Sequence, residues 1–357
     1  MRPAAAAHNP YMKTTTSPPA QDLEDLASTL AALATRSAGE GPWRSGAFAA
    51  VARSGMLAAF IAREDGGTGM DDAAITEALV VIAERCLTTA LALTQWAAAV
   101  RILTGAEVAV RATLLPRLAR GEASTTVGIS QLTTSRRHLG RPALTATHDD
   151  GAWRLDGVCP WVTGADATET IVTGAATPDG RQAFFVVETD APGLTIDPPL
   201  EMLALTGSRT SAVHFAGVRP RFTIAAPPSG GVRTGGLSTT ALAVGAARAA
   251  AAAIDREAAA RPALAGVAHG FSVEISALHG RLRAAATGGI EPTDRDRLRA
   301  DANGLVVRVA QAALTASKGT GFVAGHLVER LVRESLFFLV WSCPQAVTDA
   351  VLCDLTS

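Results

Sequence analysis

The sequence predicts an α+β protein in three successive parts: an N-terminal α-helical domain, a middle antiparallel β-barrel domain and a C-terminal four-helix-bundle domain. Apolar residues recur at three- and four-residue spacing in the first and last thirds, which indicates helices. They alternate in the middle third, which indicates strands. Ala contributes 73 of the 357 residues, whereas aromatic residues contribute 4%. A core so poor in rings requires closely packed helices that are rich in Ala.

The expected boundaries follow changes in composition. Residues 1–20 are rich in Pro, Thr, Ala and Ser and are expected to form a disordered tail. The N-terminal helical domain then covers 21–124, the middle β-domain 125–226 and the C-terminal bundle 227–357. The Pro- and Gly-rich segment Pro227–Gly231 is expected to be a flexible linker between the last two.

Individual elements follow from the same periodicities. In the N-terminal part a glycine-rich loop, Arg63–Met70, precedes a helix that Asp71 or Asp72 can cap. Helices are predicted over Gln21–Arg36, Phe48–Ile61, the segment ending near Arg85, Leu87–Leu103 and Ala106–Leu118. Strands are predicted over Leu144–His148, Ala152–Asp156, Thr170–Gly174, Ala183–Glu188 and Ser211–Phe215, with hairpin turns at Asp149–Gly151 and Pro178–Gly180. Helices return over Leu237–Arg256, Ala268–Ala286, Pro292–Ser317, Leu327–Phe338 and Ala346–Leu355.

Composition excludes several classes of function. The net charge is −1, so no basic surplus points to a nucleic-acid partner. No apolar run reaches the roughly 18 residues that a membrane span needs, and Met1–Ala20 lacks the apolar core of a secretory signal. The four Cys residues form no CxxC pair and have no metal-ligand spacing. We therefore expect a soluble, cytoplasmic protein without a bound metal.

Four sequence blocks, in order, carry a family resemblance. They are SGMLAAFIAREDGGTGM (Ser54–Met70), LLPRLARGEAS (Leu114–Ser124), GAWRLDGVCPWVTGADATE (Gly151–Glu169) and LALTGSRTSAVHFAGVRP (Leu203–Pro220). Together they resemble the acyl-CoA dehydrogenase superfamily over about residues 45–357. The resemblance implies that family's fold, a bound FAD and oxidation of an acyl thioester.

The aromatic residue Trp161 is the leading candidate for a cofactor contact. Trp161 and Thr163 lie two apart in a predicted strand, so both can face the same side. A flavin needs an aromatic wall and a hydrogen-bonding group near its reactive nitrogen N5. In the family the matching Trp packs on the flavin and the matching Thr bonds near N5, with Val162 between them. The competing interpretation is that Trp161 is an ordinary core residue.

A second cofactor segment is predicted over Thr125–Arg137, which we expect to be a strand. The resemblance places Ile129 and Ser130 along the pyrimidine side of the flavin. The family's phosphate-facing Gly-Ser-Asp is replaced here by Ser135, Arg136 and Arg137. Backbone N–H groups and an Arg side chain can both bind phosphate oxygens. The alternative is that the two Arg side chains belong to a solvated turn.

A glycine-containing loop near the C-terminus is the last cofactor candidate. ASKGTGF (Ala316–Phe322) resembles a family loop that reaches the FAD of a neighbouring subunit. Gly319 and Gly321 would allow close backbone approach to a phosphate. The resemblance therefore implies a homodimer or homotetramer. An electron acceptor or a flavin reductase is a further expected partner.

No residue fills the position of the family's catalytic base. Dehydrogenation of a thioester needs a base that removes the α-proton while hydride leaves the β-carbon. The family's usual Glu aligns with Ser342, and its alternative Glu position falls in Gly235–Gly245, which has no carboxylate. The remaining candidates are Cys343, His138 and His326. Cys343 would serve only with a depressed pKa, and the apolar segment around it favours the competing interpretation, a small buried apolar residue.

Three functions therefore stay open. The first is an FAD-dependent oxidoreductase that oxidises a CoA- or carrier-protein-bound acyl group with hydride transfer to flavin N5. The second is a flavin-dependent monooxygenase on the same scaffold, which needs no such base. The third is a flavin-binding protein without dehydrogenase activity, which the altered phosphate segment would explain.

Overall fold

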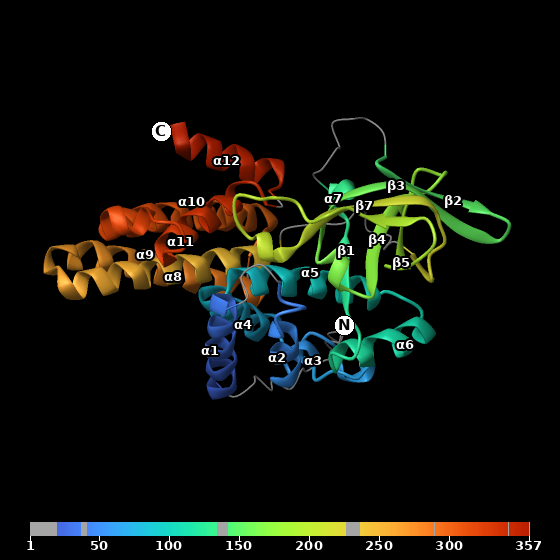
Figure 1. Ribbon diagram of the computed structural model, residues 1–357, viewed down its shortest axis with the longest axis horizontal. Coiled ribbons are helices and arrows are strands. Elements are labelled where there is room, and N and C mark those ends of the chain that lie inside the picture. The colour runs from blue at the N-terminus through green and yellow to red at the C-terminus, as the bar shows by residue number, and fades with distance from the viewer. Residues whose placement is uncertain are drawn as a thin grey trace, which may run out of the picture.

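A computed structural model describes residues 20–36, 41–133, 142–225, 236–288, 290–341 and 343–356. The chain forms helices, then a sheet, then helices again, which confirms the predicted fold class. Figure 1 shows the sheet at one end of the molecule, the C-terminal helices at the other and the N-terminal helices along one side. Apart from Ala20, which begins the first helix, the expected tail lies outside the described residues, as does most of the predicted linker region.

The N-terminal part is helical, as predicted, with one difference. Its helices are α1 (Ala20–Arg36), α2 (Ala47–Arg53), α3 (Met56–Ala59), α4 (Asp72–Arg85), α5 (Leu87–Leu103) and α6 (Val108–Ala119), with a short 3₁₀ turn η1 (Arg63–Asp65). The stretch predicted as one helix over Phe48–Ile61 is divided, because Gly55 adopts φ 75° between α2 and α3. Asp71 is the cap of α4, since its carboxylate accepts a 2.7 Å hydrogen bond from the Ala74 N–H.

The middle part is a sheet of eight strands among the described residues. They are β1 (Thr125–Gly128), β2 (Leu144–Asp149), β3 (Ala152–Thr163), β4 (Thr170–Ala176), β5 (Gln182–Glu188), β6 (Leu194–Ile196), β7 (Thr210–Val218) and β8 (Phe222–Ala225). The order is β6-β7-β3-β2-β4-β5-β8, and β1 pairs with β4 in parallel. Both predicted turns join antiparallel strands. Asp150 and Gly151 both have positive φ, as a two-residue hairpin turn requires.

Three strand predictions need correction. The segment Thr125–Arg137 is not one strand: β1 ends at Gly128, and the short helix α7 (Ser130–Thr133) follows directly. The strands β6 and β8 were missed, because each has only three or four residues and too little alternation to be recognised. β3 is longer than predicted and reaches Thr163, so it carries the whole Trp161–Thr163 motif.

The sheet separates two apolar cores. In β5, Phe184 and Val186 pack into a large core shared with the helices, whereas Phe185 and Val187 pack into a smaller core inside the sheet domain. This is the two-residue period of a strand that is buried on both faces. The helix α5 covers β1 from the helical side, so the first face of the sheet is tied to the N-terminal helices.

The C-terminal part is built around one long helix. Its elements are α8 (Leu237–Ala260), η5 (Pro262–Leu264), α9 (Ala265–Ala286), α10 (Pro292–Ser317), η6 (Lys318–Phe322), α11 (Leu327–Leu336), η7 (Phe337–Leu339) and α12 (Gln345–Thr356). α8 packs against α4, α9 and α10. It is the one helix of the described residues that is long and apolar enough to cross a membrane, and 72% of its most apolar window is buried inside the protein. That burial is what the central helix of a bundle requires.

Candidate functional site

The end of β3 and the turn after β1 form one compact unit. A Cβ on Gly128 would lie 3.0 Å from Val162 Cγ2 and 3.2 Å from Cys159 Sγ, so only glycine allows β1 to approach β3 this closely. The Thr126 hydroxyl donates a 2.7 Å hydrogen bond to the Thr163 carbonyl oxygen. The two predicted cofactor segments, which are 30 residues apart in sequence, are therefore held together.

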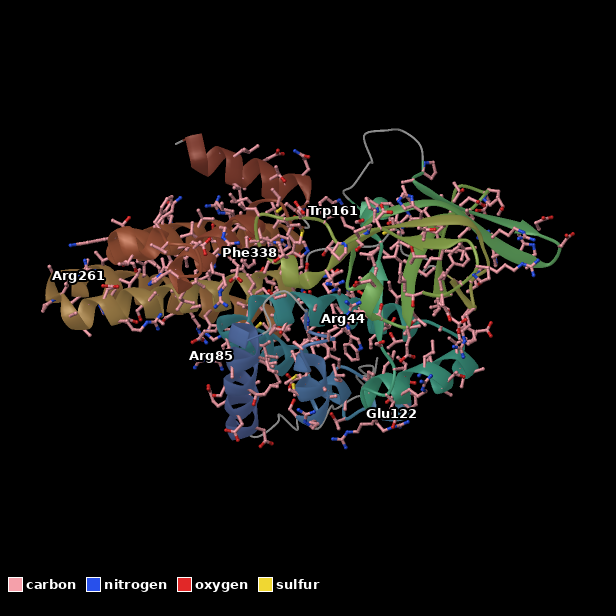
Figure 2. The ribbon with its side chains drawn as sticks, in the orientation of Figure 1. Arg44, Arg85, Glu122, Trp161, Arg261 and Phe338 are labelled. Carbon is pink, nitrogen blue, oxygen red and sulfur yellow. The ribbon has the colours of Figure 1, made fainter. Side chains whose placement is uncertain are left out.

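Trp161 is unusual for a large ring in a sheet, because 49% of it is exposed. The pairing of β3 with β7 shifts register between Cys159 and Val162, which places an extra residue in β3 beside Trp161. Such a bulge changes the direction of nearby side chains. Figure 2 shows Trp161 at the end of the sheet that faces the C-terminal helices. The exposed ring therefore does not behave as an ordinary core residue.

Thr163 and Val162 are buried behind this ring. The Thr163 hydroxyl shares a 3.1 Å hydrogen bond with the Thr210 hydroxyl, which also bonds Ser208 at 2.9 Å. Val162 has no exposed surface and packs in the sheet core. A ligand on the Trp161 side can therefore reach only the backbone of Val162, whereas the Thr163 hydroxyl belongs to a polar row with Thr210 and Ser208, where β3 ends and β7 begins.

Ile129 and Ser130 lie at the start of α7. Ile129 is buried in the larger core, and the Ser130 hydroxyl lies 3.8 Å from Cys159 Sγ. Burial raises the pKa of the Cys159 thiol to about 11, although the Ser130 contact opposes this shift. A thiol with this pKa is neutral and inert at pH 7.

Gln131, the next residue in α7, is almost fully buried. Its Nε2 donates a 2.8 Å hydrogen bond to the Gly174 carbonyl oxygen. Its Oε1 is buried and has no hydrogen-bond partner within the described part of the chain. This orphaned acceptor at the β1–α7 turn is the kind of group that a bound donor would satisfy.

The glycine loop and His326 lie away from that unit. Gly319 and Gly321 belong to η6, and a Cβ on Gly321 would lie 2.7 Å from Ser317 Cβ, so this glycine is explained by local packing. A Cβ on Gly319 would meet nothing within 4 Å. His326 caps α11: its Nδ1 accepts a 3.2 Å hydrogen bond from the Val328 N–H. An imidazole used as a cap acceptor is poorly placed to act as a base.

The family's two base positions align with the segment Gly235–Gly245 and with the segment around Trp341. One residue of each segment contacts the same side chain, Arg299 of α10. Its Nη1 donates to the Thr239 hydroxyl near the start of α8, and its Nη2 donates to the Trp341 carbonyl oxygen at 2.6 Å. Cys343 is the neighbour on the second segment: its thiol lies 3.5 Å from the Trp341 carbonyl oxygen and 3.9 Å from Asn303 Nδ2. Burial raises the pKa of this thiol, and Arg299 acts in the opposite direction.

Sequence reasoning missed Arg299 and Asn303. A signal was present, because the row Arg299, Asn303, Val306, Ala310 and Ala313 recurs at helical spacing and all five are buried. A charged and an amide side chain in an otherwise apolar row indicate a buried polar site. Several predicted site residues lie outside the described part of the chain: Ser135, Arg136, Arg137, His138 and Ser342.

The residues at the Trp161 end of β3 fit one side of a flavin. They provide a half-exposed indole ring, a nearby hydroxyl at Thr163 and an unsatisfied buried amide oxygen at Gln131. Aromatic surface for stacking and fixed polar groups for the ring edge are what such a cofactor requires.

Comparisons with known proteins give sequence relatives and structural neighbours of this chain. No protein-family model matches the chain. It is 28% identical over 231 residues to "Probable acyl-CoA dehydrogenase YngJ" of Bacillus subtilis, with 59% of each chain covered. It is 27% identical over 170 residues to L-prolyl-(peptidyl-carrier protein) dehydrogenase of Pseudomonas fluorescens, with 45% of each covered. The matched region thus spans less than two thirds of the length of these relatives.

Solved structures extend the likeness to nearly the whole chain. Butyryl-CoA dehydrogenase from Megasphaera elsdenii superposes with a TM-score of 0.81 at 19% identity, over 97% of this chain and 100% of that one. Dibenzothiophene monooxygenase from a Paenibacillus species superposes with a TM-score of 0.74 at 18% identity, over 94% of both chains. With its helix–sheet–helix order, the chain has the acyl-CoA dehydrogenase fold, and part of its sequence is similar to proteins named as dehydrogenases.

Proposed function

We propose that the protein is an FAD-dependent oxidoreductase that oxidises an acyl thioester with hydride transfer to flavin N5. The observation that carries this proposal is the half-exposed Trp161 beside the bulge of β3, at the end of the sheet that faces the C-terminal helices and two residues before Thr163. When bound, the flavin supplies the hydride acceptor. Trp161 would pack on its ring, and Thr163, Ser130 and the backbone of Val162 would hold its edge.

The acyl group is proposed to be carried by CoA or by a carrier protein. The named activities of the relatives support this, since one is called an acyl-CoA dehydrogenase and the other acts on a carrier-bound prolyl group. Gly319, Gly321, Ser135 and Arg136 stay proposed cofactor contacts. We further propose a cytoplasmic homodimer or homotetramer that passes electrons to a separate acceptor or receives them from a flavin reductase.

A flavin-dependent monooxygenase is the second candidate, and one observation favours it. The space where a carboxylate base is expected contains the buried guanidinium of Arg299. A cation there does not remove an α-proton, and an oxygenase has no need of that step. Among the described candidates, the Cys343 thiol is disfavoured as a base by its raised pKa, and His326 serves as a helix cap. Ser342 and His138 stay candidates.

Spectroscopy on the purified full chain tests both functions. We expect a flavin absorbance spectrum after reconstitution with FAD, and weaker retention of FMN. Anaerobic addition of an acyl-CoA should bleach the flavin band if the protein is a dehydrogenase. Bleaching only by a reductase with a nicotinamide, followed by oxygen uptake, would identify the monooxygenase. Failure to bind either flavin would reject both candidates and leave a non-flavin role for the fold.

A further inference from the structure

Within the described residues, the cluster around Arg299 contains a buried guanidinium that forms no ion pair with a carboxylate. Arg299 is 2% exposed, and its neighbours are the Thr239 hydroxyl, the Trp341 carbonyl oxygen and the Cys343 thiol. Burial lowers the pKa of this guanidinium, whereas Cys343 and, more weakly, Asp296 act to raise it. An unpaired buried charge costs several kcal/mol, on the order of the whole stability of many domains.

The cluster also contains two unsatisfied polar atoms. Arg299 Nε is buried and donates to no acceptor, and Asn303 Oδ1 is buried and accepts from no donor, within the part of the chain described. The two side chains are four residues apart on α10 and therefore lie on one helix face. Asn303 itself has no exposed surface. A rotated amide would let the Cys343 thiol donate to Oδ1 and leave the Asn303 NH₂ group free to donate to a ligand.

The surroundings of the cluster favour an anion. Thr239 lies in the first turn of the 24-residue helix α8, whose amino end carries a partial positive charge. The opposite wall is formed by Trp341 and Cys343, which are half-buried, and Gly236 at the start of α8 is exposed. The buried polar atoms therefore adjoin residues that are partly exposed to solvent.

We propose that Arg299 and Asn303 form a subsite for a carboxylate carried by the acyl group of the substrate. This inference rests on the proposed acyl-thioester function and narrows its substrate class to short acyl groups with a second, free carboxylate. Arg299 Nε and the Asn303 amide donate to the carboxylate, whose charge neutralises the buried guanidinium. The side chains act here as binding groups, and no proton transfer is assigned to them.

A titration with matched thioesters tests the subsite. Binding of succinyl-CoA and butyryl-CoA, which have four acyl carbons each, is measured by calorimetry on the flavin-loaded protein without turnover. We expect the wild-type protein to bind succinyl-CoA at least about tenfold more tightly. Arg299→Met should reduce that preference to about one. Asn303→Asp should also reduce the preference to about one, because the new Asp carboxylate pairs with Arg299 in place of the carboxylate of the substrate.

Arg308→Met is the matched control, since Arg308 lies on the same helix but forms an exposed ion pair with Glu274; it should keep the preference. If Arg299→Met fails to fold, the thioester preference of Asn303→Asp alone tests the subsite. Equal binding of both thioesters by the wild-type protein overturns the subsite and leaves the proposed function intact. Binding of neither thioester overturns the function on CoA thioesters, and with it the subsite.

Discussion

At the scale of single residues, the buried charged groups are the least expected feature of this Ala-rich chain. Besides Arg299, the helix α11 buries Glu334, which is 8% exposed and borders a cavity of about 130 Å³ between α11, the start of α5 and the loop near Gly207. Its nearest cation is Arg330, whose Nε lies 3.8 Å away. Burial raises the pKa of Glu334 from 4.5 to about 7, and Arg330 and Arg333 only partly oppose this.

That pKa predicts a pH-dependent loss of stability. Between pH 4.5 and 7 the folded protein retains a proton on Glu334 that the unfolded chain has released, so stability falls as pH rises through this range and levels off above it. Glu334→Gln keeps the neutral shape and should match the wild-type protein at pH 5. At pH 8 it should be more stable by about 1–3 kcal/mol. Urea denaturation at both pH values measures this, and an equal gap at both would contradict it.

Thr163 yields a prediction about flavin retention. Thr163→Ala removes the hydroxyl that is proposed to bond the flavin near N5, so we expect flavin to bind about tenfold more weakly, the equivalent of one hydrogen bond. Thr163→Ser keeps the hydroxyl and is the control that should behave as wild type. Flavin release on dilution, followed by fluorescence, measures the difference. Unchanged retention in the Ala variant would remove Thr163 from the proposed site.

At the scale of elements, strong hydrophobic periodicity was sufficient to predict where a helix begins and ends, and weak periodicity was not. The bounds predicted for α5 and α10, Leu87–Leu103 and Pro292–Ser317, are those of the structure, because long apolar rows override local preferences. The turn from β1 into α7 was missed, since Thr125–Arg137 reads as extended and only packing of Gly128 against β3 ends the strand. Trp161 could be predicted from a local motif. The Arg299 cluster could not, because it joins α8, α10 and the segment before α12.

The junction of the sheet with the N-terminal helices provides an element-scale prediction. Gly164 follows β3 with φ 68°, and a Cβ there would lie 2.3 Å from the ring of Trp43, which stacks on Phe48. Gly164→Ala should destabilise the protein by about 2–4 kcal/mol, the sum of left-handed strain and overpacking. Gly151→Ala is the control: φ is 75°, but nothing lies within 4 Å, so strain alone should cost about 1–2 kcal/mol. Equal losses would mean that the Trp43 contact is unimportant.

At the scale of the whole molecule, α8 connects the helical parts that lie on either side of the sheet in sequence. It packs on α4 from the N-terminal part and on α9 and α10 from the C-terminal part. A polar bridge accompanies it: Arg248 of α8 donates to His279 of α9, which in turn bonds Glu77 of α4 at 2.8 Å. The small side chains of α8 let these helices approach closely, so the high Ala content has a structural purpose at this crossing.

One glycine tests how closely the two helical parts must approach. A Cβ on Gly245 would lie 2.4 Å from the Val80 carbonyl oxygen and 2.7 Å from Ala83 Cβ, so it would push α8 away from α4. Helix propensity alone favours Ala over Gly by about 1 kcal/mol, yet we expect Gly245→Ala to lower the free energy of unfolding by about 1–3 kcal/mol. Gly280→Ala in α9 meets nothing within 4 Å and should instead raise it by about 0.5–1 kcal/mol. Urea denaturation followed by circular dichroism measures the free energy of unfolding of both variants. A stabilising Gly245→Ala would show that the α4–α8 crossing accommodates an added methyl group.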